Sequence, residues 1–183
     1  MRSLNELRDK AYHCALSHGL YKKDFSNKHF LCLVISDLTK AITAEKLNRH
    51  AKVERFKDYF VRMKYQKEYE KSIFLSSFEY IIYSVEDELA NAFIHLFDLA
   101  GLRSIDLDCF EYEKGDHKDY SDLYFTESMF EIIKYATEGS QENWELDHNI
   151  YMMLNELLYF CKENDIDIFF FIEQKMKYNQ YQD

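Results

Sequence analysis

The feature that most constrains this chain is the absence of proline from all 183 residues, together with the presence of only four glycines. Average usage of about 5% would give roughly nine prolines in a chain of this length. Because proline and glycine interrupt helices most strongly, long helices joined by short polar connections are favoured. Hydrophobic residues make up 47% of the chain, which argues against disorder. We therefore expect one all-α domain spanning residues 1–183.

Apolar side chains recur at helical spacing along most of the chain. Ser3 and Glu6 are placed to form a capping box, and Ser84 is a candidate N-cap of a second helix. Gly19 and Gly101 are placed to end the same two helices. The expected helices are residues 3–18, 29–50, 84–101, 126–138, 145–163 and 167–178, with a short one at 106–114 and the clearest loop at 114–121.

A weak internal repeat relates the two halves of the chain at an offset of 61 residues. Residues 104–114 resemble residues 165–175, and the apolar positions of the preceding helices also correspond, whereas the polar positions do not. Two halves are too few for a solenoid, so the expected architecture is a helical bundle of paired helices. Residues 1–114 form the half that carries an acidic site, and residues 115–183 form the second helical half.

The net charge of -10 bears on the class of partner. A general nucleic-acid binder usually has a basic surface, so nucleic acid is not expected as a partner. Residues 51–72 are an exception to this acidic character, because they contain seven Lys or Arg and only four Asp or Glu. This segment fits a solvated helical excursion, and it also fits a cationic lid over a phosphate-bearing ligand.

Targeting and redox signals point to the cytoplasm. The first ten residues carry charges and no apolar run, which argues against a signal peptide, and no run of about 18 apolar residues predicts a membrane span. The four cysteines are widely spaced without a CxxC pair, so we interpret them as reduced and mostly buried thiols. His13, Cys14 and His18 could belong to a metal site, but the sequence shows no second cluster of metal-ligating residues to complete it.

Two short polar pairs are the candidate chemistry. Asp37 and Lys40 are three residues apart on one expected helix, and Glu88 and Asn91 are three apart on another, so each pair shares a helix face. Acidic pairs presented by two facing helices could hold Mg²⁺, which prefers oxygen ligands. Such a metal would bridge nucleotide phosphates and activate a water molecule.

This spacing resembles the MazG-like all-α nucleoside triphosphate pyrophosphohydrolases, which pair an E-x-x-E helix with an E-x-x-D helix around Mg²⁺. Residues 33–41 (LVISDLTKA) resemble the first motif, and residues 86–101 (EDELANAFIHLFDLAG) resemble the second. The run KMKYN at 175–179 resembles a downstream element that holds the nucleotide, which implies substrate contacts from Lys175 and Asn179. The resemblance also implies a homodimer, a Mg²⁺ cofactor and a nucleoside triphosphate ligand.

Three of the four metal-ligand positions depart from the family pattern. They carry Asp37, Lys40 and Asn91, and only Glu88 is identical. The quartet charge falls from -4 to -1, and a protonated lysine cannot be a ligand. We therefore expect Lys40 to stand in partly for the metal by pairing with the two carboxylates, with hydrolysis impaired or lost and nucleotide binding retained.

Two other functional interpretations stay open. The first is an active enzyme that uses Asp37 and Glu88 with a substitute ligand, Glu86 or Glu45. The second is a structural or interaction protein in which packed side chains close the family's active-site cleft. No glycine-rich phosphate loop and no GxSxG motif occurs, and no catalytic residue is assigned. His95 and Asp98 are interpreted as an ordinary core or surface histidine and a polar-face residue.

Overall fold

The computed structural model describes residues 3–19, 21, 23–109, 118, 120, 122–138 and 143–182, without the side chains of residues 138 and 143–145. These residues form eight α-helices and one 3-10 turn, with no strand among them, so the all-α prediction is confirmed. In chain order the elements are α1 (Leu4–Ser17), α2 (Asn27–Lys46), α3 (Val53–Met63), η1 (Lys67–Tyr69), α4 (Glu70–Phe78), α5 (Val85–Leu102), α6 (Phe125–Glu138), α7 (Asn143–Glu163) and α8 (Ile168–Tyr181).

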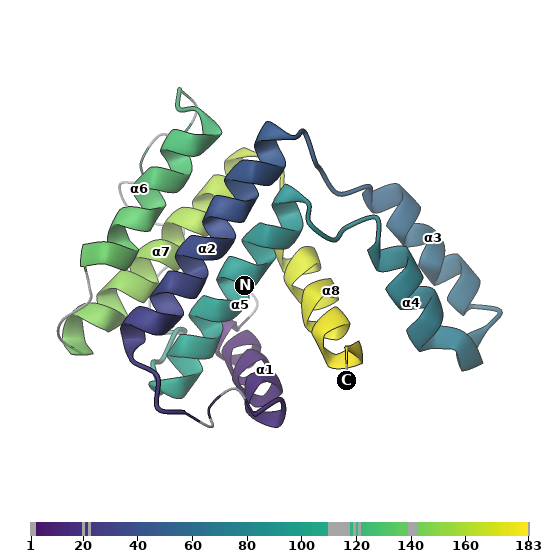
Figure 1. Ribbon diagram of the computed structural model, residues 1–183, viewed down its shortest axis with the longest axis horizontal. Helices are drawn as coiled ribbons and strands as arrows, with labels where there is room; N and C mark the ends of the chain where they lie inside the picture. The colour runs from purple at the N-terminus through teal and green to yellow at the C-terminus, as the bar shows by residue number, and fades with distance from the viewer. Residues whose placement is uncertain are drawn as a thin grey trace.

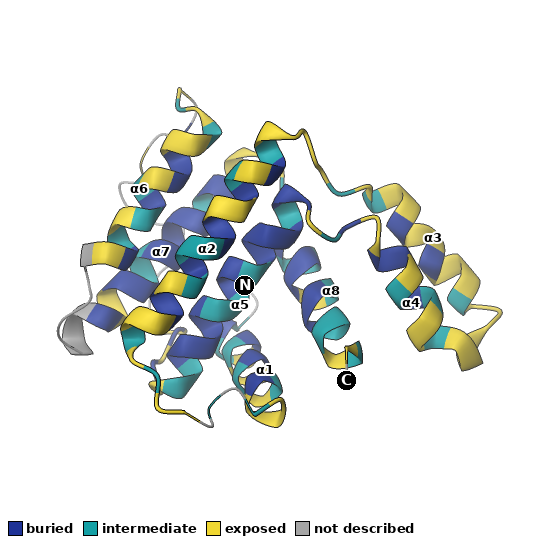
Figure 2. Cartoon of the chain, viewed as in Figure 1, coloured by how far each residue is buried: buried dark blue, intermediate teal, exposed yellow. Residues whose placement is uncertain are grey.

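Helix α5 is the centre of the bundle. It packs against α1, α2, α7 and α8, and α6 packs on the outer side of α2 and α7 (Figure 1). Most of α5 is buried, whereas the outer turns of α3 and α4 are exposed (Figure 2). A helix that is apolar almost all round is the one that neighbours can enclose. Side chains of α5 therefore face several helices at once, which is how one helix can contribute to more than one site.

The predicted N-caps are observed. The Ser3 hydroxyl accepts from the Glu6 backbone N–H at 3.2 Å, and the Ser84 hydroxyl accepts from the Asp87 N–H at 3.1 Å. Gly19 follows α1 with a φ of 69°, so the predicted end of that helix is also confirmed. These caps fix where α1 and α5 begin.

The predicted role of Gly101 as a helix end was wrong. Helix α5 continues through Gly101 to Leu102 and ends with Ser104 at a φ of 56°. A Cβ added to Gly101 would lie 2.6 Å from the Tyr12 Cβ. The glycine is therefore required by the close approach of α1 to α5.

The internal repeat is visible where α5 and α7 end. The Ile105 N–H donates to the Ala100 carbonyl at 2.9 Å, and the Ile166 N–H donates to the Cys161 carbonyl at 2.8 Å. Ser104 and Asp165, the residues before these donors, both have positive φ. Each corresponding pair is 61 residues apart, so the offset predicted from sequence relates two helix ends of the same geometry.

The two halves diverge after these helix ends. Residues 106–109 are not helical, so the start of the short helix expected at 106–114 was wrong, while 167–175 enter α8 as predicted. Residues 110–114 lie outside the described residues, as does most of the loop expected at 114–121.

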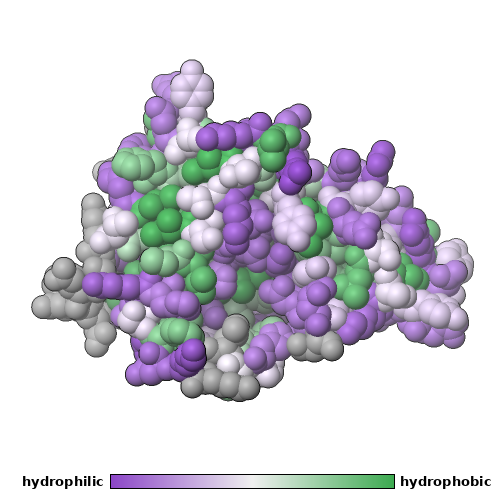
Figure 3. Space-filling model, in the orientation of Figure 1, coloured by the Kyte–Doolittle hydropathy of each residue, from purple (hydrophilic) through white to green (hydrophobic). Residues whose placement is uncertain are grey.

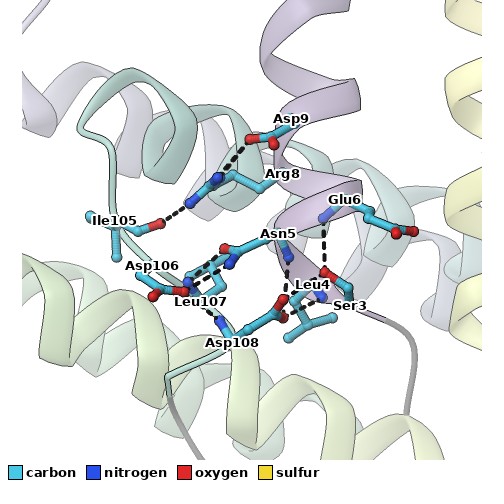
Figure 4. Close-up of polar contacts among 10 residues, drawn as sticks. All are labelled: Ser3, Leu4, Asn5, Glu6, Arg8, Asp9, Ile105, Asp106, Leu107 and Asp108. Carbon is cyan, nitrogen blue, oxygen red and sulfur yellow. Dashed lines mark hydrogen bonds and ion pairs between the residues drawn. The ribbon is translucent and has the colours of Figure 1, made fainter.

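The segment after α5 holds the start of α1. Asp108 accepts from the Ser3 hydroxyl at 2.6 Å and from the Leu4 N–H at 2.7 Å (Figure 4). The Asn5 side chain bonds to Asp106 at 2.7 Å, and the Arg8 guanidinium donates to the Ile105 carbonyl at 2.6 Å (Figure 4). A carboxylate at a helix N-terminus satisfies N–H groups that have no partner within the helix. These contacts anchor α1 against the end of α5.

Helices α3 and α4 form a hairpin that extends from the bundle (Figure 1). Its residues pack on one another and on α8, through aromatic rings that include Phe56, Phe74 and Tyr181. In the space-filling view, hydrophilic residues predominate over the hairpin (Figure 3). The helical excursion expected at 51–72 is thus present and continues to Phe78.

The prediction that the cysteines are mostly buried was wrong. Cys161 is buried and Cys14 is half-buried, but Cys32 and Cys109 are exposed. Cys32 lies on the outer side of α2, next to the buried Leu31, and the chain at Cys109 is not helical. Within the described part of the chain, no helix combines the length and apolar character needed to cross a membrane.

Candidate functional site

The predicted polar positions lie on α2 and α5, which pack side by side (Figure 1). On α2, the Lys40 Nζ donates to Asp37 Oδ1 at 2.8 Å. On α5, the Asn91 amide donates to Glu88 Oε2 at 3.4 Å. Both carboxylates are buried, whereas the Lys40 side chain is 55% exposed. Each i, i+3 pair is therefore joined by a hydrogen bond of its own.

A cavity of about 320 Å³ lies where α2, α5 and α8 meet. Three of the four predicted positions line it, and the fourth, Asp37, contacts the lining residue Lys40. The polar lining residues are Lys40, Thr43, Arg49, Tyr83, Glu88, Asn91 and Lys175. The structure therefore brings the two pairs and the predicted phosphate contact on α8 to one place. We refer to this space as the cationic cavity, because three basic side chains line it.

Asp87 is a site residue that the sequence reasoning missed. Its carboxylate is 1% exposed, and its two oxygens lie 2.9 and 3.1 Å from the Lys175 Nζ. Its Oδ2 also accepts from the Tyr83 N–H at 2.9 Å. In the sequence, Asp87 stands between Glu86 and Glu88 in the first turn of α5, where negative charge suits the helix dipole, and no motif position falls on it. Buried residues occupy nearly the whole circumference of α5, so helical spacing alone does not distinguish Asp87 from its neighbours.

Burial and neighbouring charges shift the protonation of these groups. Burial raises the pKa of Asp87, and the Lys175 ammonium opposes that rise. Burial also raises the pKa of Glu88, and the nearby Asp87 carboxylate adds to this effect. The hydrogen bond to Asp37 raises the pKa of Lys40, so this ammonium stays charged at neutral pH.

The His95 ring of α5 lies beside the Asp37–Lys40 pair of α2. Its Nε2 lies 3.4 Å from Asp37 Oδ2, an atom that is fully buried and accepts no hydrogen bond of good geometry. Burial lowers the pKa of His95, which favours the neutral ring at pH 7. Asp37 therefore lies between the Lys40 ammonium and the His95 ring.

The side chains around the cationic cavity do not fit a divalent cation. One oxygen of Asp37 accepts from Lys40, and one oxygen of Glu88 accepts from Asn91. The three carboxylates of Asp37, Asp87 and Glu88 lie among three cations, Lys40, Arg49 and Lys175, so the formal net charge is zero. Within the described residues, no group of three or more His, Cys, Asp or Glu side chains is arranged to hold a metal ion. That finding covers the neighbourhood of His13, Cys14 and His18 as well.

The two substitute ligands considered from sequence lie elsewhere. Glu86 accepts from the Ala51 N–H at 2.9 Å and lies 3.5 Å from the His50 ring. Glu45 lies 3.4 Å from the other ring nitrogen of His50. Both glutamates line a separate cavity that reaches α7 and does not include Lys40 or Glu88.

A third cavity, of about 300 Å³, lies between α1, α5 and α8. Asn179, the other predicted substrate contact, lines this space and not the cationic cavity. Asp98 also lines it, and the prediction that Asp98 is a polar-face residue was wrong, because the side chain is only 4% exposed. The Tyr21 hydroxyl donates a short hydrogen bond to Asp98 Oδ1. The walls are mostly apolar, so we refer to this space as the apolar cavity.

The two cavities follow one another along the same pair of helices. On α5, Glu88 and Asn91 line the cationic cavity and His95 and Asp98 line the apolar one. Asp98 is seven positions further along the helix than Asn91, a rise of about 10 Å. On α8 the order is the same, with Lys175 before Asn179. Two separate cavities thus lie one after the other beside α5 and α8, the first lined by three basic side chains and the second mostly apolar.

Comparison with protein-family models, with curated proteins and with solved structures returned no match.

Proposed function

We propose that this protein is a MazG-like nucleotide-binding protein in which Mg²⁺-dependent hydrolysis is lost or strongly impaired. The observation that carries the proposal is the succession of two cavities beside α5 and α8, one lined by three basic side chains and the other mostly apolar. A nucleoside phosphate has the matching distribution of charge, with anionic phosphates at one end and an aromatic base at the other. The resemblance of residues 33–41, 86–101 and 175–179 to the family's motifs supports the same conclusion.

The phosphates are assigned to the cationic cavity. Arg49 is exposed there and has no ion-pair partner among the described residues, so its guanidinium is available to a phosphate oxygen. Lys40 is more than half exposed despite its bond to Asp37. Because these cations belong to the chain itself, phosphate binding in this site does not depend on a metal ion.

Loss of hydrolysis follows from the same cations. A divalent ion about 4 Å from the Lys40 ammonium would be repelled by roughly 8 kcal/mol at an effective dielectric constant near 20. One oxygen of Asp37 already accepts from Lys40, and one oxygen of Glu88 already accepts from Asn91. The chain therefore lacks the means to position a metal-activated water in this cavity.

The first experiment measures binding and turnover separately. We expect isothermal titration in EDTA to detect nucleoside triphosphates, and we expect no pyrophosphate release when Mg²⁺ or Mn²⁺ is added. The variant Arg49→Ala should weaken binding about tenfold or more, since it removes a charged hydrogen bond. Micromolar Mg²⁺ affinity of the unmodified protein would refute the proposal that Lys40 stands in for the metal.

The second experiment restores the family's charges. The double variant Lys40→Glu with Asn91→Asp should bind Mg²⁺ and release pyrophosphate from a nucleoside triphosphate. Lys46→Glu is the matched control, because Lys46 is an exposed lysine of the same helix that does not line the cavity. If the double variant neither binds Mg²⁺ nor turns over any nucleotide, the placement of the site is wrong.

The proposal includes the homodimer that the resemblance implies. Light scattering coupled to gel filtration measures the mass directly, against 22.2 kDa for one chain. A single-chain mass at micromolar concentration would remove the dimer from the proposal and leave nucleotide binding to be judged by titration.

A further inference from the structure

The apolar cavity has the character of a site for a flat polar ring. Its volume of about 300 Å³ is at the lower end of small-molecule sites, and its walls are mostly apolar. A few polar side chains converge on it, among them Asp98 and His95 of α5 and Asn179 of α8. Apolar walls with a small number of fixed polar groups are the usual means of selecting one ligand among similar ones.

Asp98 is the charged group of this cavity. It is nine-tenths buried or more, at 4% exposure, and the Tyr21 hydroxyl holds one of its oxygens. Among the described residues only the Tyr21 hydroxyl donates to Asp98, and an ionised carboxylate has about four lone-pair sites, so most of its acceptor capacity is open to a ligand. A buried carboxylate with few hydrogen-bond donors is costly, which favours a ligand that brings donors.

We propose that the apolar cavity holds the base of the bound nucleotide and that Asp98 makes the site selective for guanine. This inference rests on the proposed nucleotide binding and adds the substrate class. The Watson–Crick edge of guanine presents two adjacent donors, the N1–H and the exocyclic amino group, beside the O6 acceptor. Asp98 accepts from the two donors, and the Asn179 amide of the facing helix donates to O6.

Other bases match this set of groups less well. Adenine presents a ring nitrogen acceptor beside its amino group, so one lone pair would face the carboxylate. Uracil and thymine place a carbonyl on each side of a single N–H, and two carbonyl oxygens would then lie next to Asp98. A site that holds a buried acceptor discriminates strongly against ligands that cannot supply the donor.

The test is isothermal titration with GTP, ITP, XTP and ATP in EDTA at pH 7.5. Hypoxanthine lacks the exocyclic amino group, so the unmodified protein should bind GTP roughly tenfold to a hundredfold more tightly than ITP. Asp98→Asn should abolish this preference and favour XTP over GTP, because the new amide donates to the xanthine O2. Gln182→Ala is the matched control, since Gln182 lines the same cavity without a part in the proposed base contacts, and it should keep the order GTP before ITP.

The outcomes separate this inference from the proposed function. If no nucleotide binds, nucleotide binding itself fails and the base assignment fails with it. If all four nucleotides bind alike to the unmodified protein and to Asp98→Asn, the assignment of Asp98 is overturned while nucleotide binding stands. Circular dichroism of each variant establishes that it is folded before its affinities are compared.

Discussion

The Lys175 ammonium of α8 contacts both carboxylate oxygens of Asp87 in α5, at 2.9 and 3.1 Å, in a position where both residues are buried. The same ammonium lies 5.6 Å from the ring centre of Phe78 and 5.3 Å from that of Tyr178. A buried charge pair is costly to desolvate, and this one fixes the Lys175 ammonium at the wall of the cationic cavity. The pair also fixes α8 against α5 beside the cationic cavity.

Removing the charge of Lys175 should destabilise the protein strongly. Lys175→Met keeps most of the side-chain volume but leaves the Asp87 carboxylate buried without its partner. Breaking a buried pair in this way costs about 3–5 kcal/mol in the free energy of unfolding. Urea denaturation followed by circular dichroism measures the change.

The control for this prediction is the double variant Asp87→Asn with Lys175→Met. Asparagine keeps an oxygen that can accept from the Tyr83 N–H and removes the uncompensated charge. We expect the double variant to recover at least half of the lost free energy. A double variant as unstable as Lys175→Met alone would mean that the packing of Lys175, and not its charge, stabilises the contact.

Local rules predicted much of the helical framework. The three-residue spacing placed Lys40 beside Asp37 and Asn91 beside Glu88, because residues three apart on a helix share a face. The caps at Ser3 and other helix starts follow from hydrogen bonds between residues close in sequence. Such features depend on short stretches of chain, so their signals are present in the sequence itself.

Features that depend on contacts between distant segments were not predictable in this way. Asp87 and Lys175 are far apart in sequence, and neither has a local pattern that names the other. Asp98 is enclosed by α1 and by Tyr21, a contact that no periodicity in α5 reveals. Gly101 looks like a helix end, and only the packing of α1 shows another requirement.

Asp98 should make stability depend on pH between about 4 and 6. Burial raises the pKa of Asp98 from 3.8 to about 6, while the Tyr21 hydrogen bond acts to lower it. Between these two values the folded protein binds more protons than the unfolded chain, so the contribution of Asp98 to stability falls as pH rises. A difference of about two pKa units corresponds to a loss of roughly 2–3 kcal/mol once pH exceeds 6.

The variant Asp98→Asn isolates this effect, because it keeps an acceptor for Tyr21 and removes the titrating group. Relative to the unmodified protein, it should gain roughly 2–3 kcal/mol in the free energy of unfolding between pH 4 and pH 7. Urea titrations at four pH values in that window measure the difference. Parallel stability curves for the two proteins would show that Asp98 titrates alike in the folded and unfolded states.

Gly101→Ala should destabilise the protein although alanine is the better helix former. Alanine would contribute about 1 kcal/mol through helix propensity. Its Cβ, however, would lie 2.6 Å from the Tyr12 Cβ, an atom close to the backbone that cannot move away without shifting α1. Overpacking of this kind costs about 1–3 kcal/mol, so we expect a net loss in the free energy of unfolding.

Thermal unfolding of Gly101→Ala beside Ser76→Ala provides the comparison for this prediction. Ser76 is an exposed helical position of α4, and its replacement should change the free energy of unfolding by less than about 0.5 kcal/mol. A gain in stability for Gly101→Ala would mean that α1 can shift away from α5 at little cost.

Lys177 should hold the α3–α4 hairpin against α8. Its Nζ donates to the Tyr59 hydroxyl and to Glu70 Oε1, both at 2.7 Å, and lies 4.8 Å from the ring centre of Phe74. Charged hydrogen bonds and cation–π contacts at a half-buried site each contribute on the order of 1 kcal/mol. Lys177→Met should therefore speed amide hydrogen exchange of residues 53–78 by about tenfold, because the hairpin opens more often.

Helix α5 supplies the internal reference for this measurement, since its amides should exchange at an unchanged rate if only the hairpin is loosened. Lys71→Met is the matched variant, because Lys71 is exposed and its ammonium lies 5.8 Å from the ring centre of Tyr181 without an ion-pair partner among the described residues. It should leave exchange in the hairpin within a factor of about two, as expected of a surface change. Equal acceleration in both variants, or acceleration that extends through α5, would show that Lys177 stabilises the whole bundle and does not act as a local tether for the hairpin.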